Sequence, residues 1–138
     1  MDRVDAATRS RIMRAIKSRD TKPELALARA LRATLPAYAM FSRRKNRLPG
    51  RPDFVVHHAW TGTRLAVFMH GCFWHLCSRH YKPPSGEAWR RKMDANRRRD
   101  IRVRRQLRAL GWRTMVVWEH EDPSRGAARV ARRIDAAD

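Results

Sequence analysis

Two cysteines and a histidine that could share one metal ion lie within nine residues of each other. The stretch reads Cys72-Phe-Trp-His-Leu-Cys77-Ser-Arg-His80, and two thiolates with an imidazole suit a tetrahedral zinc ion. His120 is the expected fourth ligand, because it follows a predicted strand and zinc would then staple a loop to that strand. The spacing leaves a second interpretation open, in which the cysteines are core residues and the histidines lie on the surface.

A carboxylate that could bind a second metal stands at the start of a predicted strand. Asp53 follows the sequence Pro-Gly-Arg-Pro, so its side chain is carried by stiff backbone, and Mg²⁺ prefers such anionic oxygen ligands. Mg²⁺ bound there could activate a water and stabilise the leaving 3′ oxygen in phosphodiester hydrolysis. The alternative is a turn aspartate that accepts hydrogen bonds from nearby backbone N–H groups.

Histidines that could move protons near neutral pH stand on either side of Gly-Cys-Phe-Trp, at His70 and His75. Histidine titrates near pH 7 and can also donate a hydrogen bond to phosphate. One of the two could instead be a zinc ligand or a buried core residue. The residue types alone leave that choice open.

The charge of the chain indicates an anionic partner. Its 138 residues include 32 Lys plus Arg against 13 Asp plus Glu, a formal net charge of +19, and basic residues gain affinity for nucleic acid by releasing counterions from phosphates. An anionic membrane surface is the second candidate, but no apolar run approaches the roughly 20 residues of a membrane span. No signal peptide opens the chain. We therefore expect a cytoplasmic, nucleoid-associated protein of bacterial type with no membrane partner.

Aromatic residues lie among the basic ones. Phe73, Trp74 and Trp89 could enter the base stack as apolar wedges, although core packing is the alternative for each of them. Arg14 and Arg97 stand in strongly basic stretches. In a chain of this charge, we expect such arginines to contact phosphates.

The elements that must position these residues begin with two predicted helices. A basic amphipathic helix over residues 8–18 is expected to contact DNA. The next helix should begin after Thr21 as N-cap, with Glu24 three residues later as in a capping box. Pro36 ends or follows that helix.

Two further helices are predicted in the second half of the chain. A long, strongly basic helix spans residues 86–110, and Gly111 is a suitable residue to follow its last turn. A short helix is predicted over residues 124–136, with Ser124 as its N-cap.

Apolar runs predict four strands, over residues 38–42, 53–57, 65–69 and 114–118. The continuous run 65–69 is typical of a central strand buried on both faces, and the run 114–118 is also predicted to be buried. A tight turn near Gly62 would make two strands antiparallel, while the long helix permits a crossover to a parallel neighbour. We predict one α/β domain over residues 1–138, with a mixed central sheet flanked by helices.

Several motifs occur in the order that is found in one nuclease family. They are Ala-Thr-Arg-Ser-Arg-Ile-Met-Arg-Ala-Ile (7–16), Leu-Pro-Gly-Arg-Pro-Asp-Phe-Val-Val (48–56), His-Gly-Cys-Phe-Trp-His (70–75), Asn-Arg-Arg-Arg-Asp (96–100) and Leu-Gly-Trp-Arg-Thr-Met-Val-Val-Trp-Glu (110–119). The chain resembles the very short patch repair DNA mismatch endonucleases, which share the restriction-endonuclease-like PD-(D/E)XK fold. The resemblance covers about residues 8–121, and several motifs in the right order are far more specific than one.

The resemblance implies an active site. Asp53 matches the metal-binding aspartate of the family, and His75 matches the histidine that assists proton transfer at the attacked phosphate. His70 and Asp100 match further active-site positions, with Asp100 orienting a histidine or a metal-bound water. Glu24 matches an acidic residue near the same site.

The resemblance also implies how metals and DNA are held. Residues 65–70 contain neither the acid nor the lysine of the PD-(D/E)XK name, and in such members a backbone carbonyl helps to bind Mg²⁺, so the carbonyl of Met69 is the expected ligand. The expected zinc ligands are Cys72, Cys77, His80 and His120. The residues expected to contact DNA are Phe73, Trp74 and Trp89 beside the mismatch, with Arg14, Arg51 and Arg97.

The resemblance finally implies a function. We expect a nicking endonuclease that cuts one strand at a T·G mismatch, with catalytic Mg²⁺ and structural Zn²⁺, in the repair of deaminated 5-methylcytosine. The expected partners are mismatched double-stranded DNA and mismatch-repair proteins, and a monomer suits an enzyme whose site cuts one strand. The alternative is a non-catalytic, zinc-containing DNA-binding protein, because Met69 stands where a Thr or Asp is often found.

Overall fold

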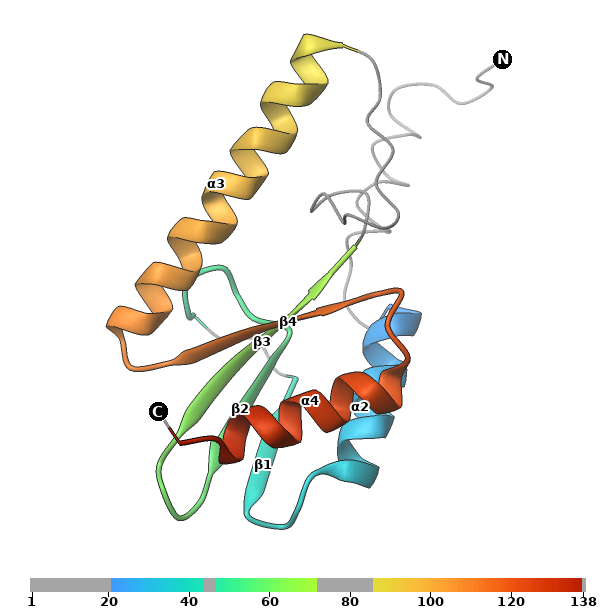
Figure 1. Ribbon diagram of the computed structural model, residues 1–138, viewed down its shortest axis with the longest axis vertical. Helices are drawn as coiled ribbons and strands as arrows, with labels where there is room; N and C mark the ends of the chain where they lie inside the picture. Colours follow the sequence, from blue (N-terminus) through green and yellow to red (C-terminus); the bar gives the residue numbers. More distant parts are fainter. Residues whose placement is uncertain (1–20, 44–46, 72–85, 138) are drawn as a thin grey trace.

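Three helices and four strands make up the part of the chain that the computed structural model describes, residues 21–43, 47–71 and 86–137 (Figure 1). The helices are α2 (Lys22–Thr34), α3 (Glu87–Ala109) and α4 (Pro123–Asp135), and the strands are β1 (Ala39–Ser42), β2 (Phe54–His58), β3 (Arg64–His70) and β4 (Arg113–Trp118). This order confirms the predicted mixed α/β architecture. The helix predicted over residues 8–18 lies outside the described residues. Among the described helices, none has the length and apolar character needed to cross a membrane.

The four strands form one mixed sheet in the order β1-β2-β3-β4. The first three strands are antiparallel neighbours, and β3 and β4 are parallel. The turn between β2 and β3 contains Gly62 at φ 73°, a left-handed conformation that favours glycine. The crossover from β3 to β4 contains α3, as parallel neighbours require. Both connections were predicted correctly from the sequence.

The central strand of the sheet is β3. Leu65, Ala66 and Val67 have no exposed surface, which confirms the predicted doubly buried strand. The prediction of a second buried strand was wrong, because β4 is an edge strand and only Val117 within it is buried. An apolar run shows that side chains face other layers, but it does not show whether both backbone edges are paired.

Helices cover both faces of the sheet (Figure 1). On one face, α2 and α4 pack against β2, β3 and β4, and the buried side chains there include Leu27, Leu31, Phe54, Val56, Val67, Val117, Val130 and Ile134. On the other face, the second half of α3 packs on a smaller cluster formed by Val55, Ala66, Leu107 and Trp112. The first half of α3 extends beyond the sheet (Figure 1), so one helix contributes to the core and also carries a long exposed basic surface.

The helix boundaries follow the local sequence with one correction. The hydroxyl of Thr21 accepts a hydrogen bond from Glu24 N at 3.4 Å, which confirms the predicted N-cap of α2. Ser124 was predicted as the N-cap of α4, but the helix begins one residue earlier, at Pro123, and Asp122 is the N-cap residue. Proline has no N–H and a helical φ, so it is well suited to the first helical position.

The C-terminal end of α4 contacts the sheet where β1 begins and β2 ends. Asp135 accepts a hydrogen bond from the Tyr38 hydroxyl at 2.8 Å and lies 3.4 Å from His58 Nε2. The other ring nitrogen of His58 accepts from the backbone N–H groups of Trp60 and Thr61, each at 3.2 Å. Both nitrogens of this buried histidine therefore have structural partners, and its position far from the start of β2 separates it from the site described next.

Candidate active site

A cavity of about 450 Å³ opens where β2 begins and β3 ends. Its wall contains Gly50, Arg51 and Asp53 from the loop before β2, Phe68, Met69 and His70 from β3, and Arg99, Asp100 and Val103 from α3. The structure thus brings together five residues that the sequence singled out: Arg51, Asp53, Met69, His70 and Asp100. Sequence reasoning did not identify Gly50, Phe68 or Val103 as site residues, and it predicted phosphate contact for Arg99 as part of the run 97–99.

The pairing of β2 with β3 explains why these residues meet. The two strands are antiparallel, with Phe54 opposite Val67, so the residue before β2 lies beside the end of β3. Met69 N donates a hydrogen bond to Asp53 Oδ2 at 2.7 Å. This bond reaches across to the neighbouring strand, so it does not cap the turn that carries Asp53. It holds one carboxylate oxygen at the wall of the cavity.

The loop before Asp53 has an unusual backbone. Gly50 and Arg51 both have positive φ, 73° and 49°, and Arg51 is the non-glycine residue with that feature in the described part of the chain. Such a conformation costs a non-glycine residue about 1–2 kcal/mol. A Cβ on Gly50 would lie 2.4 Å from Val103 Cγ1, so the loop passes directly over α3. The Pro-Gly-Arg-Pro sequence was the available signal for this close approach.

A second carboxyl group lies against Asp53. Glu24, in the first turn of α2, forms a side-chain hydrogen bond with it. The pKa of Asp53 is raised from 3.8 to about 7, chiefly by burial and then by the hydrogen bond and negative charge of Glu24, while the Met69 N–H opposes the shift. Asp53 therefore holds its proton up to near neutral pH, and a bound cation would relieve the repulsion that raises its pKa.

The donor set for a cation at this place is small. Within the described residues, no group of three or more His, Cys, Asp or Glu side chains is placed to hold a metal ion. An ion here would therefore need oxygen ligands besides Asp53 and Glu24, from backbone, water or substrate, as Mg²⁺ commonly has. In a strand, the N–H and C=O of one residue point to the same side, so the Met69 carbonyl faces the side of β3 on which Asp53 lies.

His70 and Asp100 form the opposite part of the wall. His70 is the last residue of β3, is buried, and meets the Trp118 ring edge-on with ring centroids 5.4 Å apart. A narrow extension of the cavity is lined by His70 and Asp100 together with Phe68, Val103 and Val116. The imidazole from the sheet and the carboxyl group from α3 thus border the same space.

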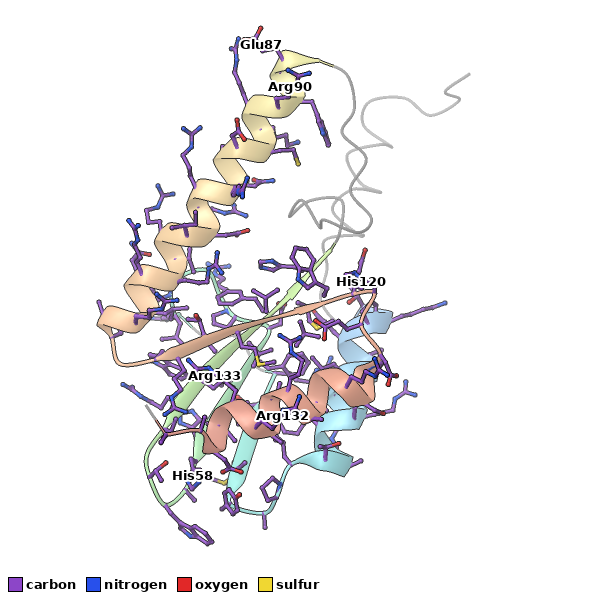
Figure 2. The ribbon with its side chains drawn as sticks, in the orientation of Figure 1. His58, Glu87, Arg90, His120, Arg132 and Arg133 are labelled. Atoms are coloured by element: carbon purple, nitrogen blue, oxygen red, sulfur yellow. The ribbon has the colours of Figure 1, made fainter. Side chains whose placement is uncertain are left out.

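The expected zinc ligands are only partly within the described residues. Cys72, Cys77 and His80 lie outside them, and His120 lies just after β4, half-buried, with its ring stacked on Trp118 at 6.3 Å. Glu119 N donates a hydrogen bond to His70 O at 3.0 Å, which brings the neighbourhood of His120 to the end of β3. Figure 2 shows His120 where the chain turns from β4 towards α4.

The expected DNA contacts are likewise only partly described. Arg14, Phe73, Trp74 and the predicted proton-transfer residue His75 lie outside the described residues. Trp89 is half-buried near the start of α3, and Arg97 is exposed on the same helix. Further exposed arginines on α3 are Arg90, Arg91, Arg98, Arg99, Arg102, Arg105 and Arg108. The helix that supplies Asp100 to the cavity therefore carries a row of cations beyond it.

Comparisons with known proteins show which proteins the chain is similar to. A protein-family model described as DNA mismatch endonuclease Vsr matches residues 1–81. The chain is 43% identical over 118 residues to the DNA mismatch endonuclease Vsr of Escherichia coli, which covers 83% of this chain and 71% of the relative. It is 38% identical over 139 residues to the type II nicking enzyme V.XorIIP of Xanthomonas oryzae, with 97% of each covered. It is also 38% identical to the type II nicking enzyme V.NaeI of Lentzea aerocolonigenes, covering 90% of this chain and 75% of the relative.

The contact between Gly50 and Val103 can be tested by a double-mutant cycle. Gly50→Ala should lower the free energy of unfolding by about 2–4 kcal/mol, because a Cβ adds left-handed strain and a clash with Val103. In a Val103→Ala background the clash with Val103 is relieved, and the left-handed strain and a 3.2 Å approach to Phe68 Cε1 remain, so the same substitution should cost less, about 1–3 kcal/mol. Urea denaturation of the four proteins measures the coupling. Strictly additive effects would show that the loop does not rest on α3 as described.

The raised pKa of Asp53 predicts a pH-dependent loss of stability in the metal-free protein. The folded state holds the proton up to about pH 7, whereas the unfolded chain releases it near 3.8. The contribution of this group is therefore fully present below about pH 4 and is lost as pH rises through 7. With EDTA present, the melting temperature of wild type relative to Asp53→Asn should fall across this range, and Glu24→Gln should reduce the fall. A constant difference between wild type and Asp53→Asn would contradict the assignment.

Proposed function

The chain belongs to the Vsr family of DNA mismatch endonucleases, and on that premise we propose that it nicks one strand of duplex DNA at a T·G mismatch by Mg²⁺-dependent phosphodiester hydrolysis. It is an endodeoxyribonuclease of the nicking type. The proposed role is very short patch repair of deaminated 5-methylcytosine. The observation that carries the proposal is the cavity in which Asp53, paired with Glu24, faces His70 and Asp100.

The proposed magnesium site uses this chain's own oxygens. Asp53 is held by the Met69 N–H, Glu24 reaches it from α2, and the Met69 carbonyl faces the same side of the strand. Two repelling carboxyl groups in a half-buried place are a chemically suitable donor set for a divalent cation. When bound, Mg²⁺ would activate a water and stabilise the leaving 3′ oxygen.

The remaining residues would move the proton and place the phosphate. His75 would assist proton transfer at the attacked phosphate, and Asp100 would orient a histidine or the attacking water. His70, fixed between Phe68 and the Trp118 ring, would contribute a hydrogen bond from a position with little freedom. Hydrolysis leaves a 5′-phosphate and a 3′-hydroxyl.

The surrounding basic surface would hold the duplex. Exposed arginines of α3, Arg97 among them, lie next to the cavity, and Arg51 stands at its rim, so phosphates on either side of the cut would meet cations. Trp89, with Phe73 and Trp74, would enter the base stack beside the mismatch, where unstacking costs least. Arg14 would add a phosphate contact from the N-terminal segment.

We also propose a structural zinc ion held by Cys72, Cys77, His80 and His120. The hydrogen bond from Glu119 N to His70 O supports it, because it joins the residue before His120 to the end of β3, two residues before Cys72 in the sequence. Zinc would then fasten the segment after β3 to the end of β4. This role is structural, and no step of the hydrolysis depends on it.

The first test is a cleavage assay on end-labelled duplexes. With Mg²⁺, wild type should nick the T strand of a T·G duplex and leave matched T·A and C·G duplexes intact. Asp53→Ala should lower the rate by about 10³-fold or more, because it removes the carboxylate that would hold the metal. Asp94→Ala removes an equal charge from an exposed position of α3 and should retain the rate of wild type.

The controls separate this proposal from a non-catalytic DNA-binding protein. Binding of the mismatched duplex without any nick, in Mg²⁺ and across several flanking sequences, would support the binding protein. Equal cutting of all three duplexes would support a nuclease but contradict the proposed specificity for a mismatch.

The zinc proposal is tested by the metal content of the purified protein. One zinc ion per chain is expected, and Cys77→Ser or His120→Ala should lower both zinc content and melting temperature, because a structural site stabilises the fold. His57→Ala, a histidine on an exposed position of β2, should keep its zinc. Wild type without zinc, or full zinc in both ligand variants, would refute the assignment.

A further inference from the structure

A groove runs between α4 and the outer edge of β4. It consists of two adjoining hollows of about 580 and 500 Å³ that share Arg129 and Arg132. We call it the α4 groove and define it by Arg125, Arg129, Arg132, Arg133, Thr114 and Val116. None of these residues lines the main catalytic cavity.

The four arginines form one row. Their spacing of four, three and one residues places them on one side of α4, and the row extends over about 12 Å at 1.5 Å per residue. Figure 2 shows Arg132 and Arg133 along this helix, opposite the end that lies near His120. The groove is therefore a linear array of cations.

Little negative charge balances this row. Glu121 is bound by Arg129, with both carboxylate oxygens 2.6 Å from Nη1. Asp135 is engaged by Tyr38 and His58 at the end of the helix. Within the described part of the chain, no acidic side chain forms an ion pair with Arg125, Arg132 or Arg133, although Asp122 lines the first hollow.

The outer edge of β4 is poorly suited to pair with another strand. Arg129 Nη2 donates to Val116 O at 3.2 Å, and Trp118 N donates to Glu121 Oε1 at 3.1 Å. Side chains thus occupy backbone groups that an added strand would need, and charged residues line the edge. An extended peptide is therefore a poor occupant, whereas a polyanion matches the charge.

We propose that the α4 groove binds the phosphate backbone of the duplex flanking the nicking site, which rests on the proposed function. Each DNA strand carries one phosphate per 3.4 Å of helix axis, so a row of about 12 Å along that axis can meet about three of them. Guanidinium groups bind phosphate through paired N–H donors. The groove would act as a second, sequence-independent contact that increases affinity for duplex DNA.

The position of the groove fits a duplex that also reaches the catalytic cavity. Val116 lines the narrow extension of that cavity beside His70 and Asp100, and it also lines the α4 groove. β4 therefore borders both that extension and the groove. Arginines of α3 lie on one side of β4 and those of α4 on the other, so both rows border the edge that faces solvent.

The test measures duplex binding and its salt dependence for Arg132→Ala/Arg133→Ala. On a matched duplex of about 40 base pairs the variant should bind roughly tenfold more weakly at moderate salt, with the log–log salt slope reduced by about 1–2. Arg29→Ala/Arg32→Ala removes the same charge from exposed positions of α2 and should change neither value.

Further variants and ligands test the proposal in other ways. Arg132→Lys/Arg133→Lys keeps the charge and should retain most of the affinity for the same duplex. An unchanged salt slope in the alanine variant, or an equal loss of duplex affinity in the α2 control, would overturn the proposal that the groove binds DNA. Weakened binding to polyglutamate with unchanged DNA binding would overturn it in favour of an acidic protein. If wild type does not nick a T·G duplex but the salt slope still falls in the variant, the groove stands and the proposed function fails.

Discussion

The hydrogen bond from Met69 N to Asp53 Oδ2 is the contact on which the site depends. It forms because β2 and β3 are antiparallel neighbours, so that the start of β2 lies beside the end of β3. It holds a carboxylate in a buried place, and that burial is the main reason why the pKa of Asp53 rises to about 7. The Met69 N–H therefore sets the orientation of this carboxylate, whereas burial and Glu24 raise its pKa against the effect of that hydrogen bond.

The other residues of the candidate site lie at the same end of the sheet. Because β3 and β4 are parallel, their last residues lie together, and Trp118 packs against His70 while Glu119 N donates to His70 O. From the α3 side, Val103 contacts the loop before β2 closely enough to require a glycine at position 50. Elements from both layers thus converge at one end of the sheet, and the strain at Arg51 is tolerated because the surrounding packing holds the loop.

The sequence predicted the features that local patterning determines. The cap at Thr21, the antiparallel pair at Gly62 and the doubly buried β3 agree with the structure, because each depends on neighbouring residues or on one apolar run. The edge position of β4 was not predicted, because side-chain patterning does not report on backbone pairing. The position of Glu24 near the site was expected from the family resemblance alone, and its hydrogen bond with Asp53, 29 residues away, was not predicted. The α4 groove could be found only once the position of α4 beside β4 was known.

The basic surface and the carboxyl pair have opposite effects on a DNA phosphate. The chain carries a formal charge of +19, yet the wall of the cavity carries Asp53, whose carboxyl group is repelled by that of Glu24. Cations on α3 and α4 would attract the phosphate backbone, whereas this carboxyl pair would repel the phosphate to be cut. A divalent cation at the pair would reverse that local sign. In the proposed function the basic surface would therefore supply affinity for any DNA, while cleavage would take place at this pair of acidic groups.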